Sequence, residues 1–309
     1  MIKKIAAIIL PIGILAAIFA WFLSVPYKLE PYITAKMDTG NPIAGETMFW
    51  AGGCGSCHAV KNAKGNEKLK LGGGHALKTP VGTFITPNIS PDEKTGIGKW
   101  TGADFANAMV VGVSPNGSHY FPSFPYTSYA RMEITDVADL WAFMKTLPVV
   151  SRDNEPHDLS PLFSVRRSIG LWKRLFLSQD PVVEIDASNT QLLRGRYLVE
   201  GPGHCAECHT PRSLFGFGGV KLNAWLSGGP APEGAKGGGG KIPNITPHEN
   251  AMGAWSVDEI TEYLESGFTP EFDSVGGSMV SVQENMAKLT AGDRSAIAAY
   301  LKSIPPIAN

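Results

Sequence analysis

The sequence carries almost no net charge. Its 27 lysines and arginines nearly balance 28 aspartates and glutamates, so the formal net charge is -1 and the pI is about 6.7. Proteins that bind nucleic acid usually present a basic patch or stripe. The composition therefore gives no reason to expect a nucleic-acid partner, and charge by itself names no other partner.

Cysteine is also scarce, with only four residues in 309. They form two short pairs, Cys54 with Cys57 and Cys205 with Cys208, and none is left over. A disulfide framework would scatter its cysteines along the chain. The pairing instead predicts two local sites of the same kind.

Alternation with the period of a β-strand is rare, and helical patterns dominate. Thr101 and Asp104 have the spacing of a capping box, and Gly112 then ends the predicted helix. The same pattern recurs later at Ser256, Glu259 and Gly267. A further helix follows each, with apolar residues three or four apart: Leu140, Met144 and Leu147, then Ile297, Leu301 and Ile304.

The two halves of the chain resemble each other. Cys54-Gly55-Ser56-Cys57-His58 returns 151 residues later as Cys205-Ala206-Glu207-Cys208-His209, and Pro87-Asn88-Ile89 returns 156 residues later as Pro243-Asn244-Ile245. Self-similarity at a nearly fixed spacing indicates a duplicated domain. We place the first copy at 41–150 and the second at 188–309.

The segment between the copies, 151–187, opens with polar and proline-rich residues, as a linker does. It then contains a basic amphipathic stretch from Val165 to Phe176. Such a helix either lies on an anionic membrane surface or packs between the two domains. We favour packing.

The N-terminus has two lysines, Lys3 and Lys4, followed by 19 uncharged residues from Ile5 to Leu23. That length is close to what a bilayer-spanning helix requires. We predict an uncleaved transmembrane anchor over residues 1–25. Lysines before the span favour a cytoplasmic N-terminus, so both domains are expected in the periplasm of a bacterium, held to its inner membrane by a single pass.

The motif C-x-x-C-H suits covalent attachment of haem. Its two thiols add to the vinyl groups of haem, and the histidine becomes the proximal ligand of the iron. A zinc site built on a C-x-x-C pair would need two further ligands. The sequence therefore predicts two covalently bound haems c, one on Cys54, Cys57 and His58 and the other on Cys205, Cys208 and His209.

Further motifs of the first copy are Gly45-Glu46, Thr79 to Phe84, Pro87 to Asp92, Thr95 to Gly98, and Pro125-Tyr126. With its C-x-x-C-H sequence they resemble the cytochrome c subunits of bacterial membrane-bound alcohol, gluconate and fructose dehydrogenases. The resemblance implies a mainly α fold of two tandem cytochrome c domains and a periplasmic dehydrogenase as partner. Those relatives generally have three haem motifs and a C-terminal anchor. They also have methionine before Pro-Tyr, where this chain has Phe124.

The distal ligand decides whether an iron is closed or open to substrate. Small cytochromes c place a methionine between their last two helices. Met279 and Met286 lie in that region of the second copy, and we predict Met279 as the ligand because Met286 is placed to pack in the core. In the first copy we predict Met132, with His119 or an open iron as the alternatives.

These features predict an electron carrier of a periplasmic respiratory chain, between a dehydrogenase or quinol-linked donor and a terminal acceptor. One alternative is a dihaem enzyme, such as a peroxidase with one open iron. Another is a structural subunit of a respiratory complex, in which the haems only conduct electrons. We therefore expect no catalytic residue beyond the haem ligands.

Overall fold

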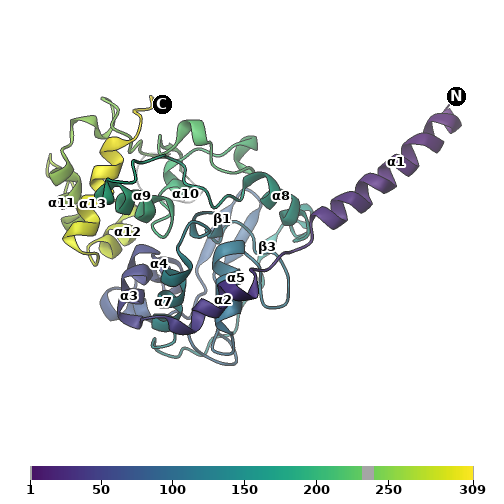
Figure 1. Cartoon of the computed structure of the whole chain (residues 1–309), viewed down its shortest axis with the longest axis horizontal. Coiled ribbons are helices and arrows are strands. Elements are labelled where there is room, and N and C mark those ends of the chain that lie inside the picture. Colours follow the sequence, from purple (N-terminus) through teal and green to yellow (C-terminus); the bar gives the residue numbers. More distant parts are fainter. Residues whose placement is uncertain (1, 232–239, 309) are drawn as a thin grey trace.

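The computed structural model describes residues 2–231 and 240–308. Figure 1 shows helix α1 projecting away from the rest of the chain, with the second half of the chain packed beside the first. The helices are α1 (Ile2–Leu23), α2 (Pro31–Thr34), α3 (Pro42–Ala51), α4 (Cys54–His58), α5 (Gly102–Val111), α6 (Tyr126–Tyr129), α7 (Ile134–Met144), α8 (Ser168–Phe176), α9 (Thr190–Glu200), α10 (Ala206–His209), α11 (Val257–Ser266), α12 (Met279–Met286) and α13 (Ala291–Ser303).

The two halves repeat one arrangement of helices, which we call domain 1 (41–150) and domain 2 (188–309). In domain 1, α3 packs against α7; in domain 2, α9 packs against α13. In each pair the two helices approach each other closely at a glycine. A Cβ on Gly45 would collide with the backbone of Asp139, and a Cβ on Gly195 would collide with the backbone of Ala296. The close approach of first and last helix therefore depends on glycine in both domains.

The predicted capping boxes are confirmed. Thr101 caps α5 with Asp104, and Ser256 caps α11 with Glu259; each pair exchanges side-chain and backbone hydrogen bonds. Each helix ends at a glycine in the left-handed conformation, a backbone geometry that favours glycine. The final helices are confirmed as well, although α7 ends at Met144, before Leu147.

Short strands accompany the helices. Strands β1 (Ala76–Thr79), β2 (Gly82–Ile85) and β3 (Asp158–Leu159) form an antiparallel sheet in that order, and β4 (Gly229–Pro230) pairs with β5 (Lys241–Ile242). These strands have two to four residues each. Periodicity over so few residues is too brief to show in the sequence.

The prediction of a transmembrane anchor at residues 1–25 is wrong. Crossing the hydrocarbon core takes about 20 consecutive, mostly apolar helical residues. In the described part of the chain, no helix combines that length with that apolarity. The N-terminal transmembrane helix of the predicted fold class and the single-pass inner-membrane location are both corrected by this finding.

Helix α8 forms within the basic stretch of the linker and lies among three parts of the chain. Arg167 donates to Ser24 Oγ at 2.9 Å, beyond the end of α1. Lys173 Nζ donates to the carbonyl of Gly112 in domain 1 at 2.7 Å. Trp172 Nε1 donates to the carbonyl of Phe217 in domain 2 at 2.8 Å. Polar side chains of α8 are thus used for contacts within the protein.

Candidate cofactor sites

Both C-x-x-C-H motifs fold as single short helices. Helix α4 holds the first motif, and α10 holds the second, with Cys205 as its N-cap residue. Gly53, just before α4, has a φ of 59°, in the left-handed region that glycine adopts without strain. Because residues three apart share one side of a helix, the two thiols of each motif face the same way.

The imidazole that follows each thiol pair is oriented by a backbone carbonyl. His58 Nδ1 lies 2.8 Å from the carbonyl oxygen of Pro87, and His209 Nδ1 lies 2.9 Å from that of Pro243. A ring that donates from Nδ1 leaves Nε2 unprotonated, which is the form that binds a metal. Burial lowers the pKa of both histidines, while the bond to the carbonyl raises it.

The residue after each proline fixes that carbonyl in place. Asn88 Nδ2 donates to the carbonyl of Val150 at 2.7 Å, and Asn244 Nδ2 donates to the carbonyl of Ile307, also at 2.7 Å. The repeated Pro-Asn-Ile motif is therefore a support for the imidazole. The recurrence of the motif in both copies was the only signal in the sequence that pointed to this role.

The four thiols are partly buried or exposed, and none is in a disulfide. Burial raises the pKa of Cys54 and of Cys205 to about 12. Burial likewise raises the pKa of Cys57 and Cys208. Burial therefore favours the protonated thiol in all four cysteines. Two thiols on one side and one oriented imidazole in each motif fit covalent haem.

The two domains meet at contacts that mirror each other. Ser56, inside the first motif, accepts a hydrogen bond from Asn285 Nδ2 on α12 at 2.8 Å. Glu207, in the matching place of the second motif, accepts one from Ser128 Oγ on α6 at 3.1 Å. Each attachment helix thus docks on the helix that precedes the last helix of the other domain.

This approximate two-fold arrangement brings the attachment sites close together. After burial, the neighbouring Cys208 is the second cause that raises the pKa of Cys57. The hydroxyl of Tyr129 donates to the carbonyl of Gly52 at 3.0 Å, and its ring meets that of His204 edge-on at 5.7 Å. Tyr129 thus contacts residues that precede both motifs, Gly52 before the first and His204 before the second.

Comparison with known proteins agrees with this geometry. The cytochrome c family profile matches residues 43–148. A "Diheme cytochrome c-type" protein of Cereibacter sphaeroides is 51% identical over 298 residues, covering 96% of this chain and 97% of the relative. The chain belongs to the cytochrome c family. Its cofactor is covalent haem c, and its role is electron transfer.

Two dehydrogenase subunits also resemble this cytochrome c. The cytochrome c subunit of a quinone alcohol dehydrogenase of Gluconobacter oxydans is 34% identical, covering 85% of this chain and 54% of the subunit. The cytochrome subunit of a fructose dehydrogenase of Gluconobacter japonicus is 32% identical, covering 84% of this chain and 52% of the subunit. The chain thus spans about half the length of these two relatives.

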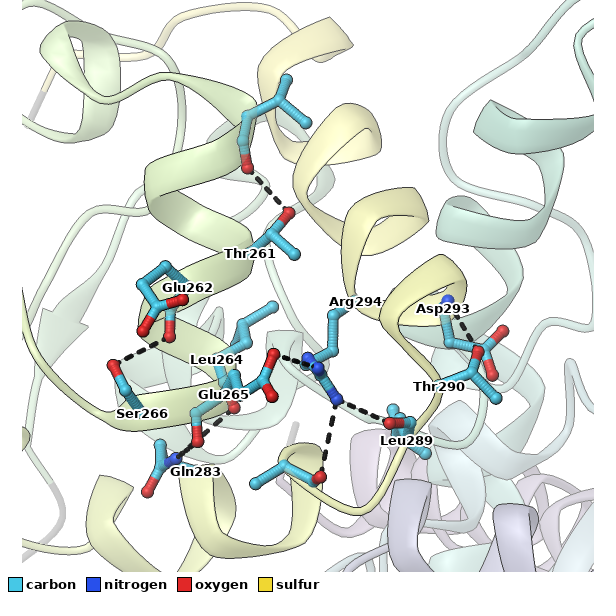
Figure 2. Close-up of polar contacts among 12 residues, drawn as sticks. Thr261, Glu262, Leu264, Glu265, Ser266, Gln283, Leu289, Thr290, Asp293 and Arg294 are labelled. Carbon is cyan, nitrogen blue, oxygen red and sulfur yellow. Dashed lines mark hydrogen bonds and ion pairs between the residues drawn. The ribbon is translucent and has the colours of Figure 1, made fainter.

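In domain 2 of the cytochrome, the predicted distal ligand Met279 is the first residue of α12. Figure 2 shows how polar contacts tie α12 to its neighbours. Gln283 Nε2 donates to the carbonyl of Glu265 at 2.7 Å, and Arg294 pairs with the Glu265 carboxylate. Arg294 Nη1 also donates to the carbonyl of Leu289 at 2.6 Å. The bond from Gln283 holds the helix that begins with Met279, and Arg294 reaches the C-cap residue of that helix through the carbonyl of Ala287 at 3.5 Å.

The candidates in domain 1 lie in different surroundings. Met132 is 7% exposed and belongs to the hydrophobic core. His119 is 3% exposed, and its Nε2 lies 2.9 Å from the carbonyl oxygen of Ser24. The structure does not bring these two residues together at one site. Met279 and Met132 as iron ligands stay predictions.

Proposed function

We propose that this cytochrome carries two haems c, on Cys54, Cys57 and His58 and on Cys205, Cys208 and His209, and relays single electrons between them. In this proposal the relay links a dehydrogenase or quinol-linked donor to a terminal acceptor of a respiratory chain. The observation that carries the proposal is the interface at which the attachment helix of each domain is hydrogen-bonded to the other domain.

The interface supports an electron path because each attachment helix is covered by the other domain. Ser56 bonds to Asn285, and Glu207 bonds to Ser128. A further link comes from Lys68, which is 4% exposed and whose Nζ lies 2.7 Å from Glu284 Oε2. These contacts would hold the two covalently bound haems at a fixed separation.

The relatives supply the class of donor. The similar proteins of Gluconobacter are cytochrome subunits of an alcohol dehydrogenase and a fructose dehydrogenase, so we propose a dehydrogenase as the electron donor. Identification of proteins that co-purify with the native cytochrome tests this part. A dehydrogenase that reduces the cytochrome upon addition of its own substrate is the expected result.

The relay itself is tested by photochemical injection of one electron into the oxidised dihaem protein. Absorbance should then show redistribution between the haems with a first-order rate that does not depend on protein concentration. A matched variant, Cys205→Ala with Cys208→Ala, removes the second attachment and should lose this phase. A rate proportional to protein concentration would contradict an internal relay. Stoichiometric reduction of peroxide at each turnover would instead favour the dihaem enzyme.

A further inference from the structure

Backbone hydrogen bonds allow the distal segments of the two domains to be matched. After α5, the amide of Tyr120 donates to the carbonyl of Gly112 at 2.8 Å; after α11, the amide of Val275 donates to that of Gly267 at 2.7 Å. An isolated antiparallel bridge precedes each bond. The spacing between the copies is therefore 155 residues at the start of the segment.

The segments match again at their ends. The amide of Ala130 donates to the carbonyl of Tyr126, and the amide of Ala287 donates to that of Gln283, both at 2.9 Å. Here the spacing is 157 residues. The distal segment of domain 2 is thus two residues longer than that of domain 1.

Met279 lies between these two anchor points, so its counterpart falls within residues 122–124. Those residues are Pro122, Ser123 and Phe124, none of which can ligate iron through sulfur or imidazole. Pro125 follows, and the helix of domain 1 begins only at Tyr126, since proline disfavours helical geometry in the residue before it. The place that Met279 takes in domain 2 has no equivalent ligand in domain 1.

Met132 does not fill this gap, because it takes the place of a leucine. Its amide donates to the carbonyl of Tyr129 at 2.9 Å, as the amide of Leu289 donates to that of Met286 at 3.0 Å. Both side chains are buried in the core, 7% and 4% exposed. The remaining methionines of domain 1 also match aliphatic residues of domain 2: Met48 with Val199, Met109 with Leu264, and Met144 with Leu301.

His119 is held away from this role by its own contacts. Its Nε2 bonds to the carbonyl of Ser24 at 2.9 Å, and its carbonyl accepts from Arg166 Nη1 at 3.0 Å. A Cβ on Gly170 of α8 would lie only 2.8 Å from that same nitrogen. The ring is therefore fixed between the end of α1 and α8 through the nitrogen that usually binds iron.

We infer that the iron bound by His58 keeps its sixth position open to a small neutral ligand, whereas Met279 closes the iron bound by His209. This inference rests on the two-haem function proposed above. Phe124 packs against the core at this segment, with its ring 5.8 Å from that of Tyr129. A ferrous haem with an open sixth position would bind carbon monoxide, whereas one closed by methionine would not.

The inference is tested by titrating carbon monoxide into the fully reduced protein under anaerobic conditions. The haem content is measured separately from the pyridine haemochrome spectrum. We expect two haems and one bound carbon monoxide per protein. We also expect a high-spin signal from one haem in the electron paramagnetic resonance spectrum of the oxidised protein. Two low-spin haems that bind no carbon monoxide would overturn the inference but leave the relay intact. A content of one haem would overturn the proposed function itself.

Single substitutions separate the candidates for the sixth ligand. Met279→Leu should raise the bound carbon monoxide from one to two per protein. Phe124→Met should supply a thioether at the matching segment and reduce the bound carbon monoxide below one. Met132→Leu, which introduces the residue of domain 2, should leave binding unchanged, as should His119→Gln. A new high-spin haem in either of these last two variants would assign the ligand to that residue and overturn the inference.

Discussion

At the scale of single residues, the orientation of each motif histidine depends on the residues that hold its backbone acceptor in place. The side chain of Asn88 is 1% exposed and bonds to the carbonyl of Val150. Its Oδ1 accepts from the amide of Ser90 at 2.9 Å. Removal of such a buried amide leaves the amide of Ser90 without its acceptor and leaves the carbonyl of Val150 with only the bond from Ser90 Oγ, which is costly. The side chain of Asn88 therefore helps to position the Pro87 carbonyl and through it the ring of His58, together with Asn154, whose Oδ1 accepts from the Asn88 amide at 2.6 Å.

Asn88→Ala should lower the free energy of unfolding by about 2–4 kcal/mol. The cause is the loss of its bonds to the backbone beyond the last helix of domain 1. Denaturant unfolding of the holoprotein measures the change. Asn250→Ala, at an exposed turn, is the control and should change stability by less than about 0.5 kcal/mol. Equal effects of the two substitutions would refute the supporting role of Asn88.

At the scale of elements, Arg294 of α13 links α11, the C-cap residue of α12 and the turn that follows it. Arg294 is 4% exposed, and it reaches the carbonyl of Leu289 and the carboxylate of Glu265 (Figure 2). Val137, 157 residues earlier, takes its place in domain 1. At this position only domain 2 therefore has a cation, which links its last helix to α11 and to the turn after α12.

Arg294→Leu should loosen α12 and lower the free energy of unfolding by about 2–3 kcal/mol. If Met279 is the distal ligand, the sulfur-to-iron absorption of the oxidised protein should weaken as well, although the ligand is still present. Visible spectra and denaturant unfolding measure the two effects. Val137→Leu is the matched substitution in domain 1 and should leave the absorption unchanged. If the sulfur-to-iron absorption of Arg294→Leu is undiminished, Arg294 does not position the ligand.

Helix α8 gives a second prediction at this scale. Lys173 Nζ donates to the carbonyls of Val111 and Gly112, at 2.6 and 2.7 Å, where α5 ends. Burial lowers the pKa of Lys173 from 10.5 to about 7. Between these two values the folded protein binds fewer protons than the unfolded chain, so the free energy of unfolding rises with pH.

Unfolding measured from about pH 6 to pH 10 should therefore show higher stability at the alkaline end in the wild-type protein. Lys173→Met should remove most of this rise. Lys221→Met changes an exposed lysine and should preserve it. Parallel pH profiles for wild type and Lys173→Met would mean that the two carbonyls keep the ammonium charged and its pKa near the ordinary value.

At the scale of the whole molecule, buried polar contacts join the two domains. Lys68 Nζ lies 2.7 Å from Glu284 Oε2 and 3.0 Å from Asn285 Oδ1. Both partners belong to α12, so domain 1 holds the distal helix of domain 2 directly. Loss of the Glu284 carboxylate, which is 35% exposed, would leave the buried ammonium of Lys68 without this counter-charge. The two domains should therefore unfold as one unit.

A double-mutant cycle on Lys68→Met and Glu284→Gln measures this coupling. We expect an interaction energy of about 1–3 kcal/mol, and calorimetry of Lys68→Met should resolve two transitions in place of one. Electron redistribution between the haems should slow in the same variant. Additive effects together with a single transition would show that the pair does not couple the domains.

Several features were determined by sequence alone because they are local. Thr101 with Asp104 and Ser256 with Glu259 cap their helices through residues three positions apart, and such contacts need no distant partner. The attachment motifs are equally local, since their chemistry lies within five consecutive residues. The duplication is visible because both copies kept these short motifs.

Other features depended on contacts between distant residues. The bond from His58 to Pro87 spans 29 residues, and that from Asn285 to Ser56 spans 229; no periodicity reports either one. Backbone hydrogen bonds of the tertiary fold also match Met132 of domain 1 with Leu289 of domain 2, and both side chains are buried. The sequence by itself therefore determined the two attachment motifs, while the packing of one domain on the other decided how the two motifs meet.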